Sequence, residues 1–115
     1  LDGGLGRDVF RFDTALHPAT NRDTINGYVV ADDTLQLENA IFAKLTVPGT
    51  LAGDAFRKGA GVVTAADPED RILYDTTTGN LYYDADGTGT SAAPIKFAAL
   101  AGSPDALSAA DFVVT

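Results

Sequence analysis

Three glycines and an aspartate near the start of the chain have the residue types and spacing of a calcium-binding turn. Residues 3–11 match the nonapeptide G-G-x-G-x-D-x-U-x, where U is a large apolar residue, at every fixed position. Glycine enters φ > 0 conformations that side chains exclude, so this turn can aim several carbonyl oxygens at one point. Calcium takes about six to eight oxygen ligands. We therefore predict a calcium site made by Asp8 and the backbone of Gly3, Gly4 and Gly6.

A second candidate for oxygen coordination is the stretch Asp84-Ala85-Asp86-Gly87. Two carboxylates two residues apart, followed by a glycine, open a loop as calcium loops do. The twelfth residue counted from Asp84 is Ile95, where an EF-hand requires a bidentate Glu, so the loop is not an EF-hand. Asp84 and Asp86 are therefore predicted metal ligands, with an Asp/Gly-rich strand connector as the alternative interpretation.

Catalytic residue combinations are missing from the sequence. The chain has no Cys and one His, and it contains neither a zinc-protease motif nor the G-K-[ST] of a phosphate loop. No base partner can be assigned to its serines. We expect a protein that is not an enzyme.

Most of the expected elements are β-strands. Residues 9–12 and 24–30 are rich in β-branched and aromatic side chains, and residues 34–38 alternate apolar and polar side chains. Residues 71–75 and 80–84 flank a Gly-containing turn and predict a hairpin, in which Tyr74 would face Tyr82 or Tyr83. Residues 94–98 predict one more strand.

Two blocks of the sequence echo each other. Phe42–Leu45 and Phe97–Leu100 both read F-A-x-L, and Leu51–Phe56 and Leu107–Phe112 both read L-x-x-x-x-F after a Gly/Pro turn. A Leu and a Phe five residues apart, with small residues between them, suit a short helical turn on a sheet. The echo predicts two units of a strand and a helical turn over one core.

Charge and composition narrow the class of protein. The formal net charge is −8, and Glu38 and Glu69 are the only Glu among sixteen acidic residues, which leaves fourteen Asp. Asp favours turns and calcium loops, whereas the acidic balance disfavours nucleic acid and anionic membranes as partners. The chain also contains no membrane-spanning run and no Cys for disulfides.

The nonapeptide resembles the last repeat of an RTX (repeats-in-toxin) calcium β-roll, and the resemblance extends along the chain. Asp23-Thr24-Ile25 and the later run 33–37 resemble the family's post-roll pattern D-x-I-x-D-F…G-D-x-I-x-L, although Gly27 and Tyr28 replace its Asp-Phe. Residues 107–115 are similar to the apolar C-termini of proteins exported by type I secretion.

The resemblance implies a mostly β fold with two parts. Residues 1–12 would end a calcium β-roll of the parallel β-helix type, and residues 13–115 would form a capping β-sandwich or sheet domain with short helical turns. The implied partners are calcium ions, upstream RTX repeats of the same chain and a type I secretion apparatus. The implied location is outside a bacterial cell, reached through an uncleaved C-terminal signal that includes Leu107, Asp111, Phe112, Val113 and Val114.

The resemblance thus implies a non-catalytic calcium-binding module that acts in calcium-dependent folding and in secretion. Two alternatives remain. The module would bind carbohydrate or a host surface through the Tyr hairpin, or it would be the end of a secreted enzyme whose active site lies upstream.

Overall fold

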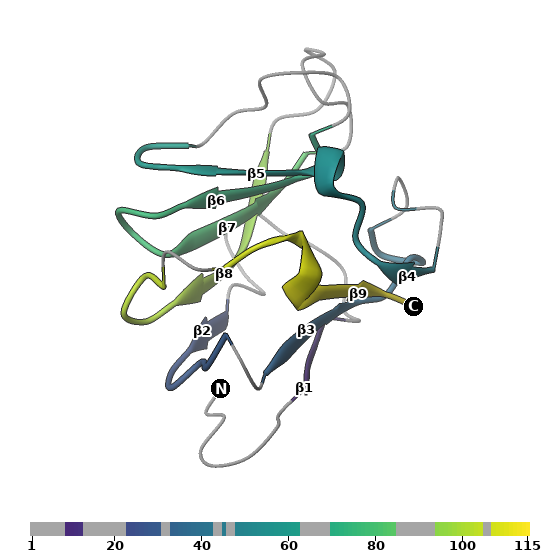
Figure 1. The fold of residues 1–115 in the computed structure, drawn as a ribbon, viewed down its shortest axis with the longest axis horizontal. Coiled ribbons are helices and arrows are strands. Elements are labelled where there is room, and N and C mark those ends of the chain that lie inside the picture. Colours follow the sequence, from purple (N-terminus) through teal and green to yellow (C-terminus); the bar gives the residue numbers. More distant parts are fainter. Residues whose placement is uncertain are drawn as a thin grey trace.

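The computed structural model describes residues 9–12, 23–30, 33–42, 45, 48–62, 70–84, 94–104 and 107–115. The chain is mostly β, as the sequence predicts, and its strands form two mixed sheets (Figure 1). One sheet has the order β1-β3-β9-β4, and its strands are Val9–Phe12, Thr34–Leu37, Phe112–Val114 and Gly49–Thr50. The other has the order β2-β8-β7-β6-β5, and its strands are Asp23–Ile25, Ile95–Leu100, Asn80–Tyr83, Ile72–Asp75 and Phe56–Gly59.

The two sheets share one apolar core. Phe12 of β1 meets Phe97 of β8 edge-on, with ring centroids 5.2 Å apart. Phe42 lies edge-on to Phe97 and to Tyr83 of β7, at 5.1 Å from each ring. Because these rings come from both sheets and are nearly all removed from water, they hold the two layers together by apolar burial.

The strand predictions hold in most places. Strands β1, β3 and β8 form where the sequence predicts strands, at residues 9–12, 34–38 and 94–98. Strands β6 and β7 form the predicted hairpin. The predicted strand 24–30 is limited to Asp23–Ile25, because Gly27 takes φ +70° and the chain turns there. The expected cross-strand tyrosine pair is wrong. Tyr74 pairs with Leu81, so the register places Tyr82 opposite Leu73.

The two L-x-x-x-x-F blocks have matching structures, whereas the two F-A-x-L blocks do not. The short 3-10 helices η1 (Gly53–Ala55) and η2 (Ala109–Asp111) stand at matching places, as the predicted helical turns. Each leads directly into a strand, and Phe56 and Phe112 open those strands with rings 5.4 Å apart. Phe97–Leu100 lies in β8, whereas Phe42 lies in a bend outside any strand.

Gly79 fixes the turn between β6 and β7 against the end of β8. Its φ is +78°, its N–H donates to the Asp75 carbonyl at 2.8 Å, and its carbonyl accepts from Leu100 N–H at 2.8 Å. A Cβ at this position would overlap the Leu100 carbonyl oxygen. Gly102 also has a positive φ, of +86°, but a Cβ there meets no atom within 4 Å.

These two glycines give a matched test of the packing. Gly102→Ala should lower the free energy of unfolding by about 1–2 kcal/mol, the cost of a left-handed residue with a side chain. Gly79→Ala should lower it by a further ~1–3 kcal/mol, because overpacking against backbone adds to that cost. Urea unfolding of the two variants measures the difference, and equal losses would contradict the close approach of Gly79 to β8.

Candidate functional site

The C-terminal segment, residues 107–115, is the part of the predicted site that the structure describes completely. Leu107 and Phe112 are fully buried, as predicted, and Val114 is 3% exposed. After the predicted helical turn, Phe112–Val114 forms strand β9, between β3 and β4 (Figure 1). Every predicted signal residue is therefore held in the folded core or directly beside it.

The turn η2 begins with a cap made by Ser108 and Asp111. The backbone N–H of Ser108 donates to Asp111 Oδ2 at 2.8 Å, in a capping-box arrangement. The Asp111 N–H donates to the Ser108 carbonyl at 3.0 Å. Asp thus replaces the usual Glu or Gln at the third position of this box and still reaches the cap.

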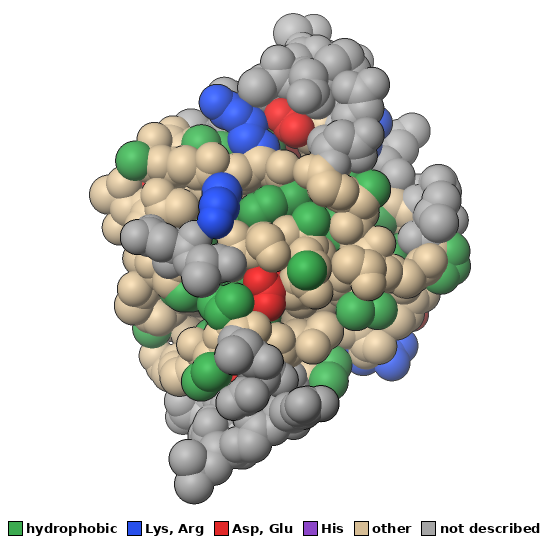
Figure 2. Space-filling model, viewed as in Figure 1, with side chains coloured by type: hydrophobic (Ala, Val, Ile, Leu, Met, Phe, Trp, Pro, Cys, Tyr) green, Lys and Arg blue, Asp and Glu red, His purple; other side chains and the backbone are tan. Residues whose placement is uncertain are grey.

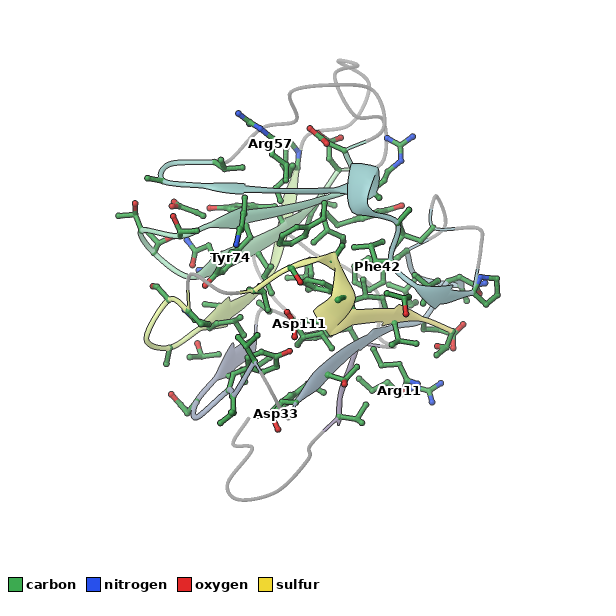
Figure 3. All side chains as sticks on the ribbon, in the orientation of Figure 1. Arg11, Asp33, Phe42, Arg57, Tyr74 and Asp111 are labelled. Atoms are coloured by element: carbon green, nitrogen blue, oxygen red, sulfur yellow. The ribbon has the colours of Figure 1, made fainter. Side chains whose placement is uncertain are left out.

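Asp111 of η2 and Asp33 just before β3, both labelled in Figure 3, each act on the buried hydroxyl of Tyr28. The Tyr28 hydroxyl donates to the Asp33 carbonyl at 3.0 Å, and Asp33 Oδ2 accepts from Val29 N–H at 2.8 Å. Burial, together with the negative charges of Asp111 and Asp33, raises the pKa of Tyr28 above its ordinary value. Burial also raises the pKa of Asp111, although hydrogen bonds from Ser108 oppose that shift.

Asp75 is a second buried carboxylate with a structural role. Its Oδ1 accepts from the backbone N–H groups of Gly61 and Thr77, at 2.9 Å each. These hydrogen bonds hold the pKa of Asp75 below its ordinary value, because they favour the charged form. Asp75 thereby ties the β6–β7 turn to the residues that follow β5.

The predicted calcium ligands are described only in part. Gly3, Gly4, Gly6, Asp8 and Asp86 lie outside the described residues. Asp84 is 2% exposed, and its N–H donates to the Arg71 carbonyl at the end of the β6–β7 ladder. Nearby, Arg71 Nη1 is buried with no hydrogen-bond acceptor among the groups that the structure describes.

Within the described ranges, no three His, Cys, Asp or Glu side chains gather as a metal site would require. The same ranges contain no helix long and apolar enough to cross a membrane.

The Tyr hairpin is mainly a packing element. Tyr74 is fully buried and donates to the Pro104 carbonyl at 3.0 Å, and Tyr83 is 5% exposed. Tyr82 is half-buried, and its hydroxyl accepts a long hydrogen bond of 3.4 Å from Asn80 Nδ2. Tyr82 is thus the hairpin's one tyrosine with an accessible ring, which weakens the carbohydrate-binding alternative.

Comparison with family models, curated proteins and solved structures finds no match.

Asp75 and Asp111 should change stability with pH in opposite directions. The pKa of Asp75 is lowered by folding, so its contribution is present above the unfolded pKa, about 3.9, and is lost as the pH falls through the folded pKa. The pKa of Asp111 is raised, so its contribution is full below the unfolded pKa and is lost as the pH rises through the folded pKa.

The measurement is urea unfolding of wild type, Asp75→Asn and Asp111→Asn between pH 2.5 and 7. The stability advantage of wild type over Asp75→Asn should grow with rising pH below about pH 4. Its advantage over Asp111→Asn should shrink with rising pH above about pH 4. Slopes of the same sign for the two pairs would show that one of the two environments is wrong.

Proposed function

We propose that this chain is a non-catalytic, calcium-binding C-terminal module of a secreted bacterial RTX protein, and that it acts in calcium-dependent folding and type I secretion. The observation that carries the proposal is the nonapeptide at residues 3–11, whose last three residues lie in β1. β1 is the outermost strand of a parallel arrangement β1-β3-β9.

The exposure pattern of β1 supports a position at the end of a β-roll. Phe10 occupies the large apolar position of the motif; it is 5% exposed and packs near Tyr28, with ring centroids 6.0 Å apart. Val9 is 62% exposed. No described strand pairs with the outer edge of β1. A preceding repeat would add its strand there in parallel, as stacked β-helix repeats do, and would cover apolar surface such as Val9.

Calcium in this proposal is held by Asp8 and the carbonyl oxygens of Gly3, Gly4 and Gly6, with Asp84 and Asp86 as a second pair. The fit rests on the chemistry of the donors, which are hard oxygens, and on the buried position of Asp84. Bound calcium supplies positive charge that offsets the carboxylates of an acidic chain. Because a metal that binds only the folded state adds its binding free energy to stability, calcium would favour folding outside the cell.

The export role in this proposal belongs to residues 107–115. In the unfolded chain this segment offers Leu107, Phe112, Val113 and Val114 with Asp111 as its only charged side chain. In the folded domain the same residues are core and central strand. Recognition by an exporter therefore has to precede folding of this domain.

Calcium binding should depend on Asp8. Because the neighbouring repeat would supply further ligands, we expect weak binding to residues 1–115, with a Kd of about 10⁻⁴–10⁻³ M. Isothermal titration should give a smaller calcium heat for Asp8→Ala than for wild type, and Asp84→Asn tests the second pair separately. Asp75→Asn is the matched control, since its carboxylate is bonded to backbone N–H groups. Equal heats for wild type and Asp8→Ala would remove the assignment.

The export role is tested by fusing residues 1–115 to a passenger in a strain with a matching exporter. Deletion of residues 107–115 should abolish transfer to the medium, because the address is lost. Phe42→Ala is the control, since a buried Phe costs about 3–5 kcal/mol when truncated and the tail stays intact. Phe42→Ala should be exported at least as well as wild type. Export of the deletion at the wild-type level would contradict the role of this segment.

A further inference from the structure

The site of interest is the space that β9 occupies. β9 pairs in parallel with β3, from Leu35 opposite Phe112 to Leu37 opposite Val114. It also pairs antiparallel with β4, with Thr50 opposite Val113. Without β9, β3 and β4 would present facing, unpaired edges, as in sheets that accept an added strand. We refer to this space as the β3–β4 slot.

The slot contacts its strand on both sides. The Leu51 N–H donates to the Phe112 carbonyl at 3.0 Å, and the Thr115 N–H donates to the Leu37 carbonyl at 2.9 Å. The Asn39 N–H donates to the Thr115 carbonyl at 2.9 Å. Phe112 fills an apolar space beside Phe56. The backbone hydrogen bonds hold the strand in register, and the packing of Phe112 beside Phe56 selects the side chain.

The segment that fills the slot carries its own local structure. The contacts of the η2 cap, between Ser108 and Asp111, lie within residues 107–115. β8, the preceding strand, belongs to the other sheet, so the chain crosses from one layer to the other before Leu107 (Figure 1). The residues that form the η2 cap therefore move with the strand when the segment leaves or enters the slot.

We call the connection between β8 and Leu107 the crossing. Two of its features act in opposite directions. Ser103 has φ +46° and is the one non-glycine residue with positive φ in the described part of the chain, a conformation that is strained for a residue with a side chain. The Tyr74 hydroxyl holds the next residue by donating to the Pro104 carbonyl at 3.0 Å. Strain at Ser103 favours opening of the crossing, and the Tyr74 hydrogen bond favours the closed chain.

We propose that the β3–β4 slot also binds residues 107–115 of a second copy of this chain, in a reciprocal exchange that forms a dimer. Each slot in the exchanged dimer makes the same hydrogen bonds and the same Phe56–Phe112 contact, so the slot itself does not distinguish the two forms. The ratio of monomer to exchanged dimer depends on the conformation of the crossing and on the protein concentration. A short linker gives an effective concentration in the ~mM range, so exchange becomes appreciable as the chain approaches ~1 mM during folding.

The absence of Cys from the chain makes a direct test possible. Gln36 and Val113 are register partners across β3 and β9, and both are half-buried. Neighbouring strands lie about 4.8 Å apart, within the ~4.4–6.8 Å that a disulfide spans. Gln36→Cys/Val113→Cys is unfolded, refolded at about 0.01 mM and at about 1 mM, and then oxidised and separated on a denaturing gel without reductant.

The expected result is an intramolecular disulfide at the low concentration and a covalent dimer at the high one. Tyr82→Cys/Lys96→Cys is the control, because these partners lie in β7 and β8, which do not exchange. The control should stay monomeric on the gel at both concentrations. Thr50→Cys/Val113→Cys reports from the β4 side of the slot and replaces the first pair if that pair does not fold.

Variants of the crossing test the cause of the exchange by light scattering, with no cysteine present. Ser103→Gly removes the strain from both crossings of a pair of monomers and should lower the dimerisation constant about 30-fold or more. Tyr74→Phe removes only the hydroxyl, again from both crossings, and should raise that constant about five- to 100-fold. Wild type refolded at about 1 mM should contain dimer.

Three outcomes overturn the proposal. One is wild type that remains monomeric after refolding at the high concentration. Another is a dimer in which the 36–113 and 50–113 disulfides are intramolecular, since that dimer associates by its surface. The third is equal covalent dimerisation of the control pair, which would show random cross-linking.

Discussion

The fold depends on placing its last strand in the middle of a sheet. β9 is flanked by β3 and β4, and Phe112 at its start is fully buried against Phe56. The partners of β9 come from residues 34–37 and 49–50, more than sixty positions earlier in the chain. Such non-local pairing loses loop-closure entropy before it gains contacts, and the pairing of β2 with β8 in the other sheet is equally distant in the chain.

Aspartate has a structural role in much of this acidic chain. Asp33, Asp75 and Asp111 are each at least 93% buried, and each accepts a backbone N–H through a side-chain oxygen. Unpaired backbone donors are costly in a protein interior, and a short carboxylate reaches them without a long flexible side chain. The Asp-rich composition therefore reflects turn and cap formation as well as any calcium loops. The prediction of calcium binding rests on the nonapeptide and the D-x-D-G stretch alone.

The echo between residues 51–56 and 107–112 shows how two turns support both sheets. η1 leads into β5 at the edge of the five-stranded sheet, and η2 leads into β9 in the interior of the four-stranded one. The rings of Phe56 and Phe112 meet where the two turns approach each other. The same local sequence therefore produces the same turn, while the neighbours of each strand decide whether it is an edge or a centre.

The sequence by itself determined much of the local structure. Alternation at residues 34–37, the Gly79 turn and the small residues before Phe56 and Phe112 each act within a few residues, so β3, the hairpin and the two helical turns could be predicted. Strands β4, β5 and β9 were not predicted. The nonapeptide and the composition of the tail were likewise readable, because they depend on residue types alone.

Tertiary structure decided the rest. The register that puts Tyr74 opposite Leu81, the burial of Asp111 beside Tyr28 and the insertion of β9 between β3 and β4 depend on contacts between distant segments. Periodicity says which face of a strand is apolar, but it does not say which strand will lie beside it.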